Sequence, residues 1–230
     1  MRMRMTTLAV AGALALALPA AAQDDQPLDL SKVPTQGKSA QDFVPPGARI
    51  EATHRGDLDK NGTPDTVLQL VGEGPAEDAD GMAVTHPRAL LVLLSEGTGL
   101  RRVGASAQVL ACTTCAGTLG GGSGEGLVKL DKGVVLVDQL RGSRDSVQTL
   151  FRFRYEPTAR RMAFIGEDVE KTDRLAGRAE KVSTNLLTGQ RITDQRRFDA
   201  KKDAFVTTSS KKSKVAAKKA FLEDVNIESY

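Results

Sequence analysis

Short apolar runs separated by turn-forming residues recur about every 8–15 residues from residue 48 to residue 193. Runs of this length are typical of strands and too short for most helices. No strong amphipathic helical period separates them, so the pattern predicts a mainly β fold of antiparallel sheets built from successive hairpins, not alternating β–α units. The expected strands cover residues 48–55, 66–71, 89–94, 99–111, 127–130, 134–140, 149–155, 161–169 and the two halves of 182–193.

Three turns indicate hairpins directly. They are Asp131-Lys132-Gly133, the segment 156–159 (EPTA) and the pair Thr188-Gly189. Each contains glycine or proline between two strand-like runs, which is the usual composition of a tight connection. The run 89–94 (ALLVLL) has no polar residue at all. Such a run predicts a buried central strand.

The chain begins with features of a secretory signal peptide. Arg2 and Arg4 precede an apolar core at residues 8–18, and small residues follow at 20–22. The core is too short to span a bilayer. We therefore expect residues 1–22 to be removed and the protein to be exported, to the periplasm or outside the cell. No later segment reaches membrane-spanning length, so no transmembrane segment is expected after signal removal.

The remaining chain divides into three parts. Residues 23–44 are polar and without period, which predicts a flexible leader, and Pro45-Pro46-Gly47 marks entry into a β-rich domain at 45–208. Residues 116–126 hold six glycines and predict a flexible loop within it. Residues 209–230 are interpreted as a basic linker and tail, in which 213–224 (SKVAAKKAFLED) forms a short helix or stays disordered until it docks.

Charge does not indicate a strong partner class. The formal net charge of +3 includes Arg2 and Arg4, so signal removal leaves about +1, which gives no global steering toward nucleic acid or membrane. Residues 201–219 hold seven lysines against one acid. Aromatic residues are not interleaved with these lysines, unlike in a single-strand-binding surface. We interpret them as a solvated linker and expect no nucleic-acid partner.

The stretch 56–70, GDLDKNGTPDTVLQL, carries the clearest chemistry. Its acidic and amide side chains alternate as D-x-D-x-N-G, with a further aspartate before an apolar run. Calcium prefers six to eight oxygen ligands, and this spacing turns alternate side chains inward while the glycine permits a sharp turn. An EF-hand would need glutamate at loop position twelve, but Leu68 stands there, and the flanks are strand-like.

The stretch resembles the FG-GAP and VCBS-type repeat loop, in which G-D-x-[DN]-x-D-G-x-x-D precedes an apolar strand. The resemblance covers about fifteen residues and implies a calcium-binding loop between two strands. Lys60 replaces the usual glycine and Asn61 the usual aspartate, which lowers the negative charge and predicts modest affinity. The implied ligands are Asp57, Asp59, Asn61, Thr63 through its carbonyl, and Asp65.

Two further questions are whether the loop recurs as in the repeat family and whether the turn needs a metal. Those repeats build propellers by repetition, but residues 77–81 and 166–173 do not match the pattern as further copies, so a propeller is not expected.

The alternative to calcium binding is a hairpin turn at Asn61-Gly62 whose Asx side chains cap the backbone without a metal. Three carboxylates within nine residues repel one another, and a cation would remove that cost.

Cys112 and Cys115 are the only cysteines. In an exported chain they are expected to form a disulfide, with a modest effect on stability because the closed loop is small. A thiol–disulfide redox pair and a metal site stay open as alternatives.

The sequence does not point to a particular enzyme. The glycine cluster at 117–126 fits neither a phosphate loop nor a nucleophile elbow, and only His54 and His86 are available as histidines. We predict a binding or structural β-domain of the cell envelope with one structural calcium loop and an unidentified envelope or extracellular partner. The alternatives are a redox protein using Cys112 and Cys115, or an envelope hydrolase.

Overall fold

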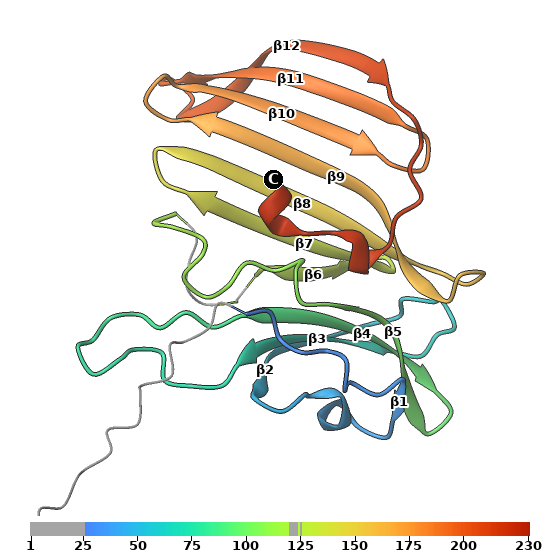
Figure 1. The fold of residues 1–230 in the computed structure, drawn as a ribbon. Helices are drawn as coiled ribbons and strands as arrows, with labels where there is room; N and C mark the ends of the chain where they lie inside the picture. Colours follow the sequence, from blue (N-terminus) through green and yellow to red (C-terminus); the bar gives the residue numbers. More distant parts are fainter. Residues whose placement is uncertain (1–25, 120–123, 125) are drawn as a thin grey trace, which may run out of the picture.

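The computed structural model describes residues 26–119, 124 and 126–230. It contains two antiparallel sheets, of five and seven strands, in which strands adjacent in sequence pair as hairpins (Figure 1). The predicted fold class is therefore confirmed. The predicted signal peptide 1–22 and most of the glycine-rich centre of the 116–126 loop lie outside the described residues.

The five-stranded sheet has the order β1-β5-β4-β3-β2. Every neighbouring pair is antiparallel. Its strands are β1 (Gln36–Gly37), β2 (Ala48–Gly56), β3 (Asp65–Gly72), β4 (Arg88–Glu96) and β5 (Gly99–Ser106).

The seven-stranded sheet is a continuous meander, in the order β12-β11-β10-β9-β8-β7-β6. Its first turn follows the predicted hairpin at 131–133, where Lys132 and Gly133 both have positive φ, as the two central residues of a tight hairpin require. The strands are β6 (Val128–Asp131), β7 (Val134–Gly142), β8 (Asp145–Glu156), β9 (Arg161–Asp173), β10 (Arg178–Asn185), β11 (Gln190–Asp199) and β12 (Ala204–Lys214).

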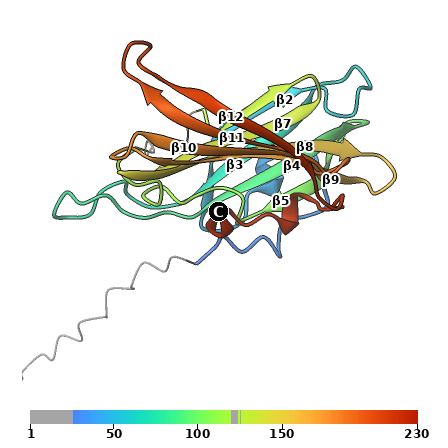
Figure 2. The ribbon, with the colours of Figure 1, turned by 90° about the horizontal axis from the view of Figure 1, so that it is seen from above.

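The main hydrophobic core lies between the sheets, which are stacked in Figure 2. Strands with one buried face show alternating burial, as in β7, where Val135 and Val137 are buried and their neighbours are half-buried. Phe151 and Phe153 of β8 also point into this core and pack against Phe164 of β9. Each sheet therefore supplies one apolar face to a shared interior.

A second core lies on the opposite face of the five-stranded sheet and corrects the prediction of a flexible leader. The described part of the leader, residues 26–44, crosses this face, pairs through β1 with β5, and forms the 3₁₀ helix η1 (Ala40–Phe43) (Figure 1). Phe43 is 0% exposed and packs with Val33 against Leu68 and Leu91. These few apolar residues form no regular pattern within the polar leader, so the sequence did not predict their burial.

The C-terminal boundary is also different from the prediction. Residues 209–214, predicted as linker, continue β12 in antiparallel pairing with β11. The last sixteen residues form no α-helix; they return to the core through two short 3₁₀ helices, η2 (Leu222–Asp224) and η3 (Ile227–Ser229). Leu222, Val225 and Ile227 are buried between the sheets, so the tail is part of the folded domain.

The tail makes a testable contribution to stability. Leu222 is fully buried, and a Cβ placed on Gly104 of β5 would lie 3.0 Å from its Cδ2 atom. We expect Leu222→Ala to lower the free energy of unfolding by about 2–5 kcal/mol, because it removes apolar contacts and leaves a cavity. Urea unfolding would measure this change. Leu187→Ala, at a residue 51% exposed, is the matched control and should change it by less than about 0.5 kcal/mol; equal losses would contradict the docked tail.

Candidate metal centre

The aspartate-rich stretch forms the loop of the β2–β3 hairpin, as the sequence predicted for a strand-to-strand connection. Gly56 ends β2 and pairs with Asp65, which begins β3. The turn between them needs left-handed backbone at two positions, Lys60 with φ of 64° and Gly62 with φ of 86°. Glycine adopts this conformation without steric cost, whereas a side chain is disfavoured. Glycine at the position of Lys60 would avoid this cost.

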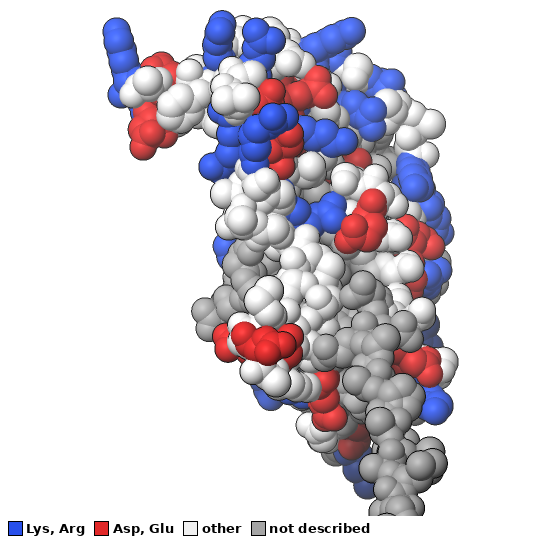
Figure 3. All heavy atoms as spheres, turned by 60° about the vertical axis from the view of Figure 1, so that its left-hand side comes forward, with Lys and Arg blue, Asp and Glu red and all other residues white. Residues whose placement is uncertain are grey.

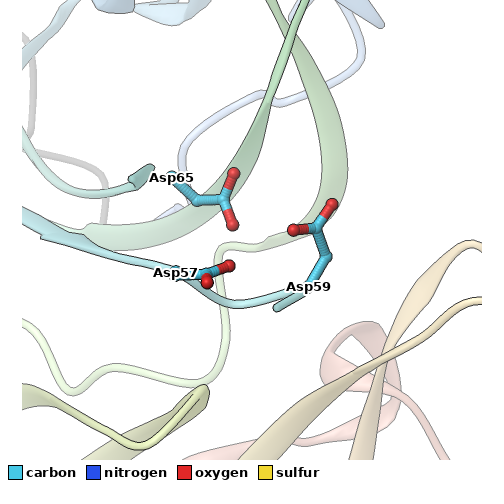
Figure 4. Close-up of side chains that lie close together, drawn as sticks. All are labelled: Asp57, Asp59 and Asp65. Atoms are coloured by element: carbon cyan, nitrogen blue, oxygen red, sulfur yellow. The ribbon is translucent and has the colours of Figure 1, made fainter. Parts of the chain in front are cut away.

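Three of the predicted ligands come together in this loop. Asp57, Asp59 and Asp65 each offer a carboxylate oxygen, and the three oxygens lie within 4.8 Å of one another (Figure 4). Asp57 and Asp59 are half-buried, while Asp65 is fully buried. The loop thus gathers up to three negative charges in a small volume at the surface of the domain.

Backbone N–H groups stabilise the same carboxylates. The N–H of Gly62 donates to Oδ2 of Asp57, and the N–H of Asn61 donates to Oδ1 of both Asp57 and Asp59, at 2.9–3.2 Å. These are the bonds of an Asx-capped turn. They do not exhaust the acceptors, because each carboxylate oxygen has two lone pairs. The turn geometry and a cation are therefore compatible.

Asp65 connects the loop to the neighbouring strand. Its two carboxylate oxygens accept 2.8 Å hydrogen bonds from the backbone N–H groups of Leu58 in the loop and Ser95 at the end of β4. Burial raises the pKa of Asp65 above its ordinary value of 3.8, an effect that these two hydrogen bonds only partly offset. A cation beside this carboxylate would compensate for the water it has lost.

The loop also contacts the second sheet. Leu58 is 2% exposed and belongs to the core between the sheets. A Cβ on Gly56 would lie 3.1 Å from Leu130 of β6, and one on Gly133 would lie 3.4 Å from the carbonyl oxygen of Asp57. The β2–β3 loop and the β6–β7 hairpin are thus packed together, so the conformation of the carboxylate cluster and the contact between sheets depend on each other.

The other two implied ligands are placed differently. The Asn61 side chain spans the turn: its Nδ2 donates to Asp59 and its Oδ1 accepts the N–H of Thr63. Thr63 itself is exposed. Of the five implied ligands, the three aspartates lie together through their carboxylates, whereas the Asn61 side chain forms hydrogen bonds within the turn.

The cysteines form the predicted disulfide, Cys112–Cys115. The bridge lies in the loop after β5, whose backbone pairs with the end of the β3–β4 connection through Thr113 and His86. This arrangement agrees with the structural interpretation of the pair.

A buried polar cluster beside this loop was missed by the sequence analysis. Arg88 of β4 forms a two-pronged ion pair with Glu51 of β2, with both N···O distances 2.8 Å, and Gln69 of β3 donates to the same carboxylate. Burial raises the pKa of Glu51, but the hydrogen bonds from Arg88 and Gln69 outweigh it and leave that pKa below its ordinary value. The polar residue Gln69, between Leu68 and Leu70 of an apolar run, is the sequence feature that could have indicated this cluster.

Arg88 also explains how the disulfide loop is fixed. Its guanidinium donates to the carbonyl oxygens of Ala111 and Cys112, at 3.3 and 3.2 Å. Strand β4 therefore positions the loop by charge-assisted hydrogen bonds. We assign this cluster a structural role.

Comparisons with known proteins give no relative from which a function could be transferred. No family model, no curated protein and no solved structure matches the chain. Among the residues that the structure describes, none of the helices has the length and apolar character needed to cross a membrane.

The buried carboxyl of Asp65 gives a pH prediction. Because its pKa is raised in the folded state, the folded protein holds this proton more tightly than the unfolded chain does. The resulting stability is present below about pH 3.8 and is lost as the pH rises through the folded-state pKa. Carboxyl-detected NMR titration without calcium should give Asp65 a midpoint above 3.8.

Asp42 is the internal reference for that titration. Hydrogen bonds from the backbone N–H groups of Ser39 and Lys38 lower its pKa below 3.8. An Asp65 midpoint at or below that of Asp42 would contradict the buried placement of the carboxylate.

Proposed function

We propose that this protein is an exported binding or structural β-domain of the cell envelope, in which a calcium ion stabilises the β2–β3 loop. The observation that supports calcium most directly is the convergence of the Asp57, Asp59 and Asp65 carboxylates within 4.8 Å. Export rests on the signal-peptide pattern of residues 1–22, and the structural role rests on the packing of the loop.

The spacing of the carboxylates suits a hard cation. Calcium–oxygen distances are about 2.3–2.6 Å, so any two ligands of one ion lie within about 5 Å of each other. The three carboxylate oxygens satisfy this limit. Oxygen-only donors also suit calcium better than a softer metal, which would favour histidine or cysteine.

The proposed ligands have separate roles. Asp57 and Asp59 supply charge from the half-buried turn, and Asp65 supplies it from the fully buried start of β3. The amide oxygen of Asn61 and the carbonyl oxygen of Thr63 would complete the set after the Asn61 side chain turns from its contacts with Asp59 and the Thr63 N–H. When bound, the ion supplies positive charge that removes the repulsion among the three carboxylates.

The position of the loop favours a structural role for the ion. Leu58 lies between Asp57 and Asp59 and is buried in the core between the sheets. Holding the flanking carboxylates in place therefore holds Leu58 against β6. Asp65 extends the same constraint to β4 through Ser95. One ion would thus fix the contact among three segments that are distant in sequence.

The redox alternative has less support. Cys112 and Cys115 are joined to each other, and the loop that carries them is fixed by Arg88 and by pairing with the β3–β4 connection. These contacts are those of a structural bridge.

Calcium should stabilise the purified, folded protein. At a free calcium concentration 100 times the Kd, linkage predicts about 2.7 kcal/mol of added stability, equivalent to a rise of about 5–10 °C in the thermal midpoint for a chain of this size. Asp59→Ala should abolish this rise, because it removes one carboxylate from the cluster. Thermal unfolding in calcium and in chelator measures both effects.

Asp78→Ala is the matched control. Asp78 is an exposed aspartate in the β3–β4 connection whose carboxylate also accepts two backbone N–H bonds, from Asp80 and Met82. This variant loses a comparable turn cap but leaves the cluster intact, so its calcium-dependent rise should equal that of the unmodified protein. Equal midpoints of the unmodified protein in calcium and in chelator would refute the proposal.

A further inference from the structure

Positive charge is concentrated in the last three strands of the seven-stranded sheet. Residues 178–219 contain twelve Lys or Arg against four Asp or Glu, a net charge of +8. Residues 26–127, which include the five-stranded sheet, contain eight against twelve, a net charge of −4. Lys and Arg accordingly cover much of the upper end of the molecule in Figure 3, where β10–β12 lie. The near-neutral total conceals this separation.

In the part of the chain that the structure describes, the lysines of β12 have no acidic partner. Lys211, Lys212 and Lys214 are exposed, and none of the ion pairs found among the described residues includes them. No acid occurs between Ala204 and Leu222. Their sequence alone predicts a solvated linker, but the structure places these lysines on a paired strand. They therefore form a fixed row of like charges.

This row lies on the free edge of the sheet. Within residues 26–119, 124 and 126–230, β12 pairs only with β11, and a register shift opposite Gln195 and Arg196 interrupts the pairing. Lysines and bulges on an edge strand prevent pairing with another strand. Three lysines within four residues also repel one another, and an anionic partner would remove that repulsion.

A hollow at the end of this edge has only hydrogen-bond donors among its charged groups. Its volume is about 560 Å³, and its cationic lining residues are Arg191, Lys212 and Lys214. Gln190, Ile192 and Ser213 complete the lining, so no acidic residue contributes. Lys212 and Lys214 share one face of the sheet, whereas Arg191 pairs with Ser213, on the other face, and its Nε donates to Thr184. The two ammonium groups can donate hydrogen bonds to the oxygens of one phosphate group.

The direction of the side chains restricts the shape of the partner. Successive residues of a strand point to opposite faces, so Lys211 projects from one face of the sheet edge and Lys212 and Lys214 from the other. A membrane plane would approach one face, whereas a thin chain along the edge can contact both. A single-stranded nucleic acid would favour aromatic side chains on which its bases stack. The β11–β12 hairpin has no aromatic residue between the pair Gln190 and Lys214 at one end and the pair Phe198 and Phe205 at the other.

We propose that the edge formed by Lys211, Lys212 and Lys214 of β12 binds a linear, phosphate-bearing polymer other than nucleic acid. The polymer lies along the strand and places one phosphate group in the hollow at its end. This surface is remote in sequence from the calcium loop and does not depend on the proposed metal.

The test uses the full chain after removal of residues 1–22, with fluorescently labelled long-chain polyphosphate as the probe, in EDTA. Anisotropy titration should show binding that weakens as salt rises. K211S/K212S/K214S should weaken it about tenfold or more at 50 mM salt and reduce the slope of log K against log salt by about 2, because three phosphate contacts are lost.

Two further variants separate this site from general charge attraction. K32S/K38S/K129S removes the same charge from exposed positions outside β10–β12 and should retain the original affinity at 150 mM salt, where the Debye length is about 8 Å. K211R/K212R/K214R keeps the charge and should keep the binding. Circular dichroism and thermal midpoints confirm that each variant is folded.

The proposal would be overturned by no binding of polyphosphate or by equal losses in the two serine variants. Tighter binding of a single-stranded oligonucleotide of equal charge, or binding to phosphatidylglycerol vesicles in place of polyphosphate, would also overturn it. Competition by inorganic phosphate only at concentrations far above those of polymer phosphate supports a polymer; equal competition by free phosphate contradicts it.

Discussion

The fold depends on covering both faces of the two central strands β3 and β4. All eight residues of β3 are buried, as are the first seven of β4. In an antiparallel sheet with one solvent-exposed face, apolar and polar residues alternate along each strand. Strands that are buried on both faces instead require an apolar layer on each side. The seven-stranded sheet supplies one layer, and residues 28–44 supply the other. Without either layer, large apolar side chains would face water.

Several polar contacts are consequences of that double burial. The strand ends must carry polar groups to connect with loops, and groups buried there need partners. Arg88 at the start of β4 meets Glu51 and Gln69, while Asp65 at the start of β3 receives N–H bonds from Leu58 and Ser95. One cluster fixes the disulfide loop and the other fixes the aspartate loop, at opposite ends of the same strand pair.

The two proposed surfaces lie on different parts of this frame. The aspartate loop lies at one contact between the sheets, near Leu58 and Leu130, so the proposed ion would act on the fold. The lysine edge of β12 lies on the part of the seven-stranded sheet that extends beyond its partner (Figure 1), where side chains are free to meet another molecule. Net charge is negative in residues 26–127, which include the aspartate loop, and positive in residues 178–219, which include β12.

Local sequence determined strands β2–β11, the three hairpin turns at 131–133, 156–159 and 188–189, the turn at Gly62 and the cysteine pair, because alternation, turn residues and short spacing act within about ten residues. The tertiary structure alone decided that Phe43 and Leu222 belong to the core, that 209–214 extends a strand, and that Glu51 meets Arg88. Those outcomes depend on surfaces brought together from distant segments: an isolated apolar residue in a polar stretch shows no period, and a lysine-rich strand pairs because β11 offers its edge. The same reason applies to Asp65, whose buried carboxylate contacts β4 through Ser95 as well as its own loop through Leu58.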